Sequence, residues 1–325
     1  MRNSGKMYLP LSVFIFTFAM LAAVHTNIER PMLLLERFFK GWGWAEIVLV
    51  SAYGSLIAYF MQDPVKAPKW RRITWTIFAV FFFLQLAAGL LISEKFLMTG
   101  KLHLPIPAMI IAGPLYRGEL SVMTALFIST LILTGPAWCS HLCYFGAFDN
   151  AASGVKKSRA PLKRLKAAKA TTLALIITAT LTLRFLKVPV NIVTAIALAF
   201  GLASIGIIIF STTRKGRMVH CVKFCPIGTT VNVLKNINPF RMFIDSACNL
   251  CMQCSIHCKY DALGVNDIKN KKPGITCTLC GDCLPACHSS SIKYRFFSLK
   301  PETARYLYLF LTISIHSVFF GLARI

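Results

Sequence analysis

Acidic residues are scarce in this sequence, and charged residues of either sign are few. Its 325 residues contain 12 Asp and Glu, only 15% of the chain is charged, and 56% is hydrophobic. A soluble protein of this length needs more polar surface than that. The composition therefore argues against an ordinary soluble globular protein and favours one for which the lipid bilayer is much of the solvent.

The 36 Lys and Arg residues give a formal net charge of +24, which by itself suggests nucleic-acid binding. Their positions argue otherwise, because they lie in the gaps between apolar runs. Basic loops of this kind fix the orientation of a membrane protein. We therefore expect membrane lipid as a partner of these segments, and no nucleic acid.

Seven apolar runs are long enough, or nearly so, to cross about 30 Å of hydrocarbon. They lie at about 8–25, 43–61, 73–93, 119–137, 170–188, 189–211 and 303–322. The fifth and sixth runs turn over at Lys187, Val188 and Pro189. The first run follows Arg2 and Lys6, as a signal peptide does, but no clear small-x-small cleavage site follows it. We interpret it as a retained span.

The Lys and Arg residues also predict the orientation. The block 156–169 contains more Lys and Arg residues than any loop on the opposite side of the membrane. This predicts that the block and the N-terminus lie inside, at the cytoplasmic face of the inner membrane. Two outside segments are not plain loops. Residues 30–40 have the pattern of an amphipathic helix in the interface. Residues 104–115 are apolar but short and proline-broken, which favours a re-entrant segment.

The first four of the 12 cysteines belong to an internal repeat. Cys139, Cys143, Gly146 and Asn150 recur 82 residues later as Cys221, Cys225, Gly228 and Asn232. The shared pattern is C-x3-C-x2-G-x3-N, and each copy follows a span predicted to run from outside to inside. Two related hairpins, roughly 73–150 and 170–232, are thereby predicted to place their cysteines side by side.

The segment 248–287 carries the most specific signal, two runs of the pattern C-x2-C-x2-C-x3-C. A cubane needs four thiolates at its iron corners, and in this pattern three come from one run and the fourth from the other. We therefore predict one 4Fe–4S cluster on Cys248, Cys251, Cys254 and Cys287, and a second on Cys258, Cys277, Cys280 and Cys283. A zinc ribbon, the main alternative, usually has two CxxC pairs instead.

Two fully ligated clusters leave no open coordination site, which favours electron transfer over substrate chemistry. The expected fold class is an α-helical multi-span membrane protein with a small α+β two-cluster ferredoxin-like domain. We expect an N-terminal transmembrane pair with the interfacial helix in 1–72 and duplicated hairpins in 73–239. The ferredoxin-like domain then occupies 240–298, and a C-terminal transmembrane helix occupies 299–325.

These motifs resemble those of a known family. The segment 248–287 is similar to bacterial two-cluster ferredoxins, and it follows spans that end in Cys139-x3-Cys143 and Cys221-x3-Cys225-Pro226. This combination, over about 119–297, resembles the membrane polyferredoxins typified by NapH, the quinol dehydrogenase subunit of periplasmic nitrate reduction, with NosR and CcoG as relatives. The resemblance implies electrons that pass between the quinone pool and a redox partner protein in a multi-subunit complex.

The sequence departs from the family pattern at three positions. Lys259 and His288 follow the last cysteines of the two runs, where proline is usual, and Tyr144 replaces the proline of the first C-x3-C-P motif. These prolines shape turns and are not ligands, so the clusters are expected to remain. NosR-like proteins carry a large extracytoplasmic flavin domain, and no outside segment of this sequence is long enough to form one. The resemblance is therefore to the shorter NapH-like proteins.

The role of the cysteines in the repeat stays open at this point. Cys139, Cys143, Cys221 and Cys225 could ligate a third iron–sulfur centre at the repeat interface, form a redox-active dithiol pair, or be structural, with Gly146 and Gly228 allowing close packing. Cofactors shared between repeats favour the first. His141 and His220 lie beside these cysteines, either as further ligands or tuning groups or as plain interfacial residues.

A quinol site needs an apolar slot and a proton acceptor. Candidate acceptors on the outer side are His25, Glu29, His103 and Glu119, each of which can also be a satisfied interfacial group. An outer site would lie a membrane thickness away from the predicted clusters, whereas an inner site near Cys139 and Cys221 would lie close to them. His316 with His25 is a weaker hypothesis, as a haem ligand pair.

Three functions follow from these patterns. The preferred one is a quinone-linked oxidoreductase, resembling the NapH-type quinol dehydrogenase. The second is a metal reductase or assembly factor resembling CcoG, and the third is an electron-wire subunit without its own quinone site. The eleven Met residues are scattered, with Met218 alone close to a cysteine pair, which gives little support to a metal route.

Overall fold

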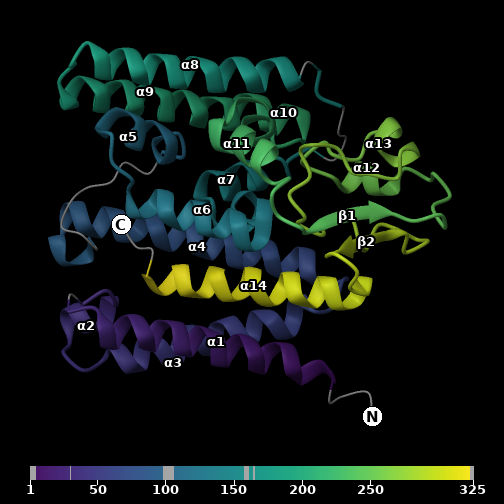
Figure 1. Cartoon of the computed structure of the whole chain (residues 1–325), viewed down its shortest axis with the longest axis horizontal. Coiled ribbons are helices and arrows are strands. Elements are labelled where there is room, and N and C mark those ends of the chain that lie inside the picture. Colours follow the sequence, from purple (N-terminus) through teal and green to yellow (C-terminus); the bar gives the residue numbers. More distant parts are fainter. Residues whose placement is uncertain (1–4, 30, 98–105, 157–160, 164, 323–325) are drawn as a thin grey trace. The chain divides into compact units, whose positions relative to one another are not determined.

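The computed structural model describes residues 5–29, 31–97, 106–156, 161–163 and 165–322. Over these residues the chain is mainly helical, with one two-stranded sheet. It divides into two compact units, one made of Met1–His103 with Leu299–Ile325, the other of Leu104–Ser298 (Figure 1). The mostly helical fold class is confirmed, whereas the four-domain division stays a prediction.

The first unit is a bundle of four long helices. They are α1 (Gly5–Asn27), α3 (Gly43–Met61), α4 (Ala67–Leu91) and α14 (Pro301–Leu322), accompanied by the short α2 (Leu34–Phe38) and η1 (Glu94–Phe96). Val13, Ile57 and Ile313 are among the buried residues that join α1, α3 and α14. The Arg305 guanidinium donates hydrogen bonds to the carbonyls of Gln62 and Met61 at 2.7 and 2.9 Å and thereby caps the end of α3.

The second unit combines helices with a small α+β segment. Its helices are α5 (Met109–Arg117), α6 (Val122–Thr134), η2 (Gly135–Ala137), η3 (Trp138–Leu142), α7 (Tyr144–Ala152), α8 (Leu165–Phe185), α9 (Val190–Ile207), η4 (Ile208–Thr212), α10 (Thr213–Lys215), η5 (His220–Phe224) and α11 (Pro226–Leu234). Three of the short ones, η3, η4 and η5, are wound as π-helix. Single π-helical turns inside helices are frequent at functional sites.

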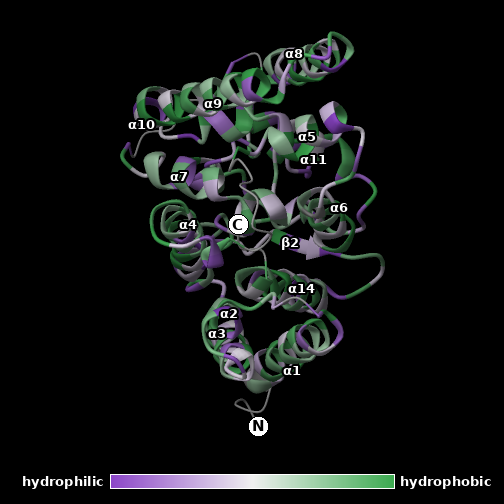
Figure 2. Cartoon of the chain, turned by 90° about the vertical axis from the view of Figure 1, so that its left-hand side faces the viewer, coloured by the Kyte–Doolittle hydropathy of each residue, from purple (hydrophilic) through white to green (hydrophobic). Residues whose placement is uncertain are grey.

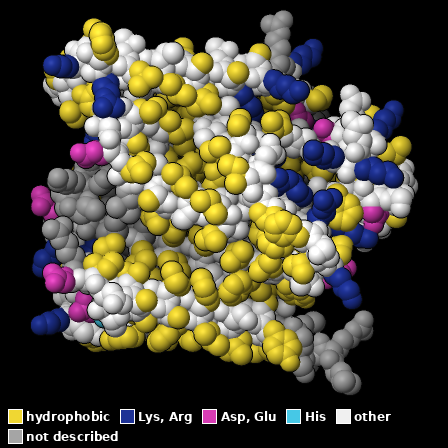
Figure 3. Space-filling view, in the orientation of Figure 1, with side chains coloured by type: hydrophobic (Ala, Val, Ile, Leu, Met, Phe, Trp, Pro, Cys, Tyr) yellow, Lys and Arg dark blue, Asp and Glu magenta, His cyan; other side chains and the backbone are white. Residues whose placement is uncertain are grey.

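Seven helices are long and apolar enough to cross a membrane, as the sequence predicts. They cover Met7–Asn27, Gly43–Met61, Ala67–Leu91, Met123–Leu142, Leu165–Phe185, Val190–Lys215 and Pro301–Leu322. Hydrophobic residues dominate the long helices in Figure 2 and cover much of the surface over them in Figure 3. The third starts at 67 instead of 73, because Pro68 occupies its first turn, where proline favours helix entry.

The first and last parts of the α+β segment pair with each other as two strands. Strand β1 (Arg241–Ile244) pairs antiparallel with β2 (Ile292–Arg295), with Ile244 opposite Ile292. Between them lie the short helices α12 (Gln253–His257) and α13 (Val265–Lys269) and both cysteine runs. Lys and Arg side chains are numerous over this end of the second unit (Figure 3).

Candidate metal centres

Both cysteine runs of 248–287 fold around the same backbone turns. Leu250 and Met252 have positive φ angles of 59° and 61° in the first run. Leu279 and Gly281 have them at the same two positions of the second run, 57° and 77°. For residues other than Gly this conformation costs roughly 1–3 kcal/mol and gathers at functional sites. Such turns aim successive backbone N–H groups at an anion, as at many iron–sulfur sites.

The last cysteine of each run is also held in the same way. The backbone N–H of Ala262 donates to Sγ of Cys258, and that of Ser291 donates to Sγ of Cys287, each at 3.3 Å. Hydrogen bonds to cysteine sulfur tune iron–sulfur centres. The two halves of the segment are therefore equivalent in local structure.

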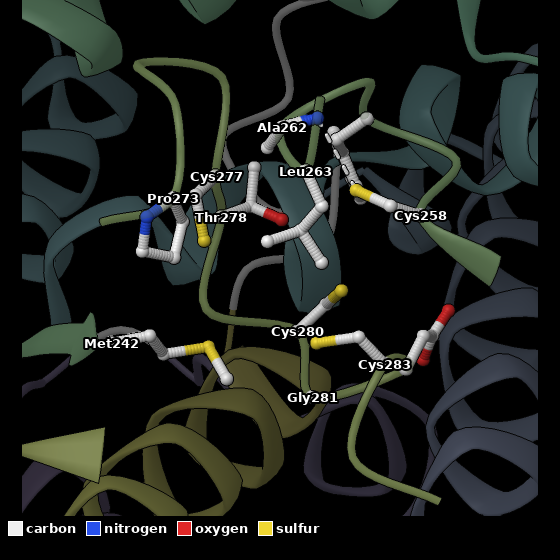
Figure 4. Close-up of a pocket in the computed structure, with 12 residues that line it drawn as sticks. Met242, Cys258, Ala262, Leu263, Pro273, Cys277, Thr278, Cys280, Gly281 and Cys283 are labelled. Carbon is white, nitrogen blue, oxygen red and sulfur yellow. Dashed lines mark hydrogen bonds between the residues drawn. The ribbon is translucent and has the colours of Figure 1, made fainter. Parts of the chain in front are cut away.

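The second ferredoxin set, defined as Cys258, Cys277, Cys280 and Cys283, lines a single pocket. Figure 4 shows these four side chains around it, with Met242 at the edge. The thiol of Cys283 interacts electrostatically with the three others. The structure thus brings together the four residues that the sequence assigns to one cluster.

Two buried hydroxyls beside this pocket suit such a cluster. Thr276 and Thr278 flank Cys277, and both are buried. Their Oγ1 atoms have no hydrogen-bond partner among the described residues. Leaving a buried donor without a partner is costly, whereas the sulfur atoms of an iron–sulfur cluster accept hydrogen bonds. The donor set and its surroundings therefore fit a 4Fe–4S group.

The first ferredoxin set, defined as Cys248, Cys251, Cys254 and Cys287, is also brought together. The thiol of Cys254 interacts electrostatically with the other three. Cys254 is buried, whereas Cys251 is exposed. This set therefore lies closer to the protein surface than the second ferredoxin set, in which Cys283 is buried. The ligand role of both sets stays a prediction.

Within the described ranges, no group of three or more His, Cys, Asp or Glu side chains is placed to hold a single metal ion. A single zinc ion needs donors that converge within about 2.0–2.3 Å of one point. A cubane instead takes its thiolates at four separate corners.

Burial changes the acidity of these thiols. It raises the pKa of Cys258 to about 12 and that of Cys254 to about 11. Both groups therefore hold their protons at neutral pH, and a metal group bound through thiolates must displace them. Because fewer protons remain to be displaced as the pH rises toward these values, cluster binding strengthens in that direction.

The repeat set, defined as Cys139, Cys143, Cys221 and Cys225, sits on two copies of one local structure. In each copy a π-helical turn, η3 or η5, holds the first cysteine. The second cysteine, Cys143 or Cys225, is extended with ψ of 115° or 121° and caps a nine-residue helix, α7 or α11. The thiol of Cys221 interacts electrostatically with the three others. The fold therefore brings the repeat set together across the repeat.

A buried carboxylate that the sequence reading missed orders this set. Asp149 on α7 is fully buried. It accepts hydrogen bonds from the Thr212 hydroxyl at 2.6 Å and from the backbone N–H of Cys221 at 2.9 Å. Burial raises the pKa of the Asp149 carboxyl to about 6, against the lowering effect of these hydrogen bonds. Asp149 joins the first copy of the repeat to the cysteine turn of the second.

Asp149→Ala is expected to destabilise the second unit by about 1–3 kcal/mol, because it leaves the buried Thr212 hydroxyl and the half-buried Cys221 N–H without an acceptor. Asp149→Asn keeps one acceptor oxygen and should cost less. Thermal unfolding of both variants in detergent measures the difference. An unfolding midpoint of Asp149→Ala equal to that of the wild type would show that the carboxylate does not hold the two copies together.

The α+β segment is joined to the repeat by buried hydrogen bonds. The Tyr260 hydroxyl donates to the Cys139 carbonyl at 2.8 Å, and the Ser140 hydroxyl donates to the Thr278 carbonyl at 3.3 Å. Tyr260 also lines the pocket of the second ferredoxin set. One buried residue therefore touches both the repeat set and the second ferredoxin set.

The departure from proline after Cys258 has a structural reason. The Lys259 ammonium donates to the carbonyl and the side-chain oxygen of Asn150, both at 2.8 Å, and is buried. Asn150 is the last residue of the C-x3-C-x2-G-x3-N pattern. Arg217, paired with Asp261 at 3.5 Å, donates to the carbonyl of Cys258. Lysine thus replaces a turn-shaping residue with one that fastens the segment to the repeat.

The histidines beside the repeat set are both buried. The Nδ1 atom of His141 lies 2.9 Å from the Ser140 hydroxyl. The Nδ1 atom of His220 has no hydrogen-bond partner within the described part of the chain. Burial lowers the pKa of His220 to about 4, so its imidazole is neutral at physiological pH. A neutral imidazole beside Cys221 agrees with either a ligand or an apolar neighbour of the centre.

Three of the outer proton-acceptor candidates, His25, Glu29 and Glu119, lie within the described residues. Glu29 and Glu119 are exposed, and the His25 ring packs edge-on against Trp44 at 5.3 Å. His103 lies outside the described residues.

The two histidines of the haem hypothesis have other neighbours in the described structure. His316 lies 3.0 Å from the Tyr53 hydroxyl, whereas His25 packs on Trp44. Positions 44 and 53 of α3 are about 13 Å apart along the helix axis at 1.5 Å per residue. The structure thus gives the two histidines different neighbours on α3, and the haem pairing stays a prediction.

Comparison with known proteins supports the cysteine chemistry. A family model described as a 4Fe-4S binding domain matches residues 118–161 and 196–237, the two copies of the repeat that carry the repeat set. No curated protein and no solved structure matches the chain. With seven helices long and apolar enough to cross a membrane, the chain carries a 4Fe–4S binding domain and has the features of a membrane iron–sulfur protein of electron transfer.

Proposed function

We propose that this chain conducts electrons between the quinone pool and a redox partner protein, as a NapH-like subunit of the inner membrane with its α+β segment in the cytoplasm. Three cysteine sets hold one 4Fe–4S centre each, and such centres supply one-electron transfer when bound. The observation that carries the proposal is the buried contact of Tyr260, which joins the second ferredoxin set to the repeat set.

The contacts of the chain order the three sets. The repeat set lies at the ends of membrane-length helices, since Cys139 is within the helix Met123–Leu142. The second ferredoxin set is next, because Tyr260 contacts both sets. The Lys235 ammonium also donates to the Cys277 carbonyl at 3.1 Å and interacts electrostatically with Cys139. The first ferredoxin set follows, with its exposed Cys251 facing solvent.

The two ends of this order match the two partners. A quinone near Cys139 and Cys221 would reach the repeat set directly. Electrons would then not have to cross the membrane from a quinone site on the outer side. At the other end, Leu250 and Ile256 are 49% and 48% exposed beside the exposed Cys251. Apolar side chains around an accessible redox group suit contact with another protein.

Quinol-driven reduction tests the function. The protein is purified without oxygen, and a short-chain quinol is added while the iron–sulfur absorbance is followed. We expect the absorbance to bleach, and an isolated wire subunit without a quinone site would leave it unchanged. A metal reductase would instead show bleaching that reverses on addition of a ferric or cupric salt but not of quinone.

The first ferredoxin set is expected to lose its iron first on mild oxidation, because its Cys251 is exposed and susceptibility follows exposure. Iron retained on the chain should fall by about four atoms in the first phase, one cubane. The EPR signal lost in that phase should be the one missing from Cys251→Ser. Loss of the signal that is missing from Cys283→Ser would reverse the proposed order of exposure.

A further inference from the structure

Two lysines with little solvent exposure lie beside the repeat set. Lys169 on α8 is buried, with 6% of its surface exposed. Lys235 is half-buried at the end of α11. Lysine is almost never buried unless its charge has a partner. Each of these ammonium groups therefore needs a source of negative charge.

The largest electrostatic attractions on Lys169 come from Cys225, Cys139 and Cys221. The packing agrees with this, because α8 contacts both η5 and α11, the elements next to Cys221 and Cys225. Lys235 adds a like charge and increases the demand for a negative group. The cysteines of the repeat set are thus the main counter-charge of Lys169.

Lys235 connects this region with the second ferredoxin set. Its ammonium donates to the carbonyls of Ile275 and Cys277 at 2.5 and 3.1 Å. The cysteines that attract it most strongly are Cys277 first and then Cys139. One positive charge is therefore shared by two cysteine sets, whereas Lys169 faces the repeat set.

Protonated thiols are neutral and cannot balance the buried Lys169 ammonium and the half-buried Lys235 ammonium. Four thiolates around a 4Fe–4S group carry net negative charge, which grows when the group is reduced, and net charge is one of the features that set its potential. A fixed positive charge in a region of low dielectric stabilises the reduced form more than the oxidised form. Burial also protects this effect from screening by salt.

We propose that Lys169 and Lys235 are positioning residues that raise the reduction potential of an iron–sulfur centre on the repeat set, so that it accepts electrons from quinol. Lys169 acts on this centre alone. Lys235 acts on it and on the centre of the second ferredoxin set. The proposal rests on the proposed function, since it requires a centre on Cys139, Cys143, Cys221 and Cys225.

The test is an EPR-monitored redox titration of the full-length protein in detergent. Lys169→Met should shift the midpoint potential of the repeat-set centre to more negative values, and Lys169→Arg, which keeps the charge, should restore most of it. Lys166→Met is the matched control, because Lys166 is exposed on the same helix and should cause no comparable shift. Lys235→Met should shift two centres, at a half-buried position that tolerates substitution better.

The outcomes separate this proposal from the proposed function. Wild-type protein with about eight irons instead of about twelve would remove the repeat-set centre altogether. Full iron with unchanged potentials in Lys169→Met, or an equal shift in Lys169→Arg, would overturn the role of the lysine charge alone. If Lys169→Met loses iron, Lys235→Met decides: an unshifted repeat-set potential in that variant would overturn the proposal.

Discussion

Cys221→Ser is expected to lower the iron content from about twelve to about eight atoms per chain and to abolish quinol-driven bleaching of the remaining centres. Cys221 belongs to the repeat set, and its thiol interacts electrostatically with the three other thiols of that set. Loss of one thiolate opens the centre that lies nearest to the quinone in the proposed order. Dithionite, a small reductant, should still reduce both ferredoxin sets, because these lie in the separate α+β segment.

Lys223→Gln is the control for this variant, two residues away on the same turn and outside the cysteine set. It should keep the wild-type iron content and bleaching rate. A Cys221→Ser protein that retains all its iron and is still reduced by quinol would show that the repeat set is structural or a dithiol, as the sequence alone allows.

Cys283→Ser is expected to interrupt the chain of centres in the middle. Cys283 is buried in the pocket of the second ferredoxin set and interacts with its three other thiols. We expect loss of about four irons, one cubane, and a much slower quinol-driven reduction of the first ferredoxin set. Freeze-quench EPR after mixing with quinol follows each centre separately.

Met242 lines the same pocket and carries no thiol, so Met242→Leu is the matched control. It preserves volume and should keep iron and rates near those of the wild type. If the first ferredoxin set of Cys283→Ser were reduced by quinol as fast as in the wild type, the order repeat set, second set, first set would be contradicted.

Local patterns explain why the sequence predicted so much of this architecture. Span length and apolar composition are properties of single segments, and seven such helices are present. Cysteine spacing is equally local. The turns it requires recur in both runs, with left-handed residues at Leu250 and Leu279. The repeat could be read as well, since both copies keep the same residues and the same π-helical turn.

Long-range partners could not be predicted in this way. Asp149 meets Cys221 across 72 residues of chain, and Lys259 meets Asn150 across 109. Spacing within a motif says nothing about such pairs, which depend on how α7, η5 and the α+β segment pack. A signal was present nonetheless. Asp149 is an acidic residue within a C-x3-C-x2-G-x3-N motif of a chain poor in acids, and Lys259 replaces an expected proline.

The ends of the membrane-length helices also depended on local structure that hydropathy does not indicate. The fourth membrane-length helix continues to Leu142 instead of ending near 137, because a 3-10 turn and a π-helical turn extend it through Cys139. Hydropathy alone ends this helix at Gly135 and Pro136. The extension places a cysteine of the repeat set within the helix, which no apolar count indicates.

Metal analysis of the anaerobically purified chain, with EPR of its reduced form, tests the central claim most directly. About twelve irons and matching sulfide, with signals from three interacting centres, are the predicted result for three sets of four cysteines. Zinc in place of iron, or no metal at all after anaerobic reconstitution, would contradict an electron conduit built on these thiolates.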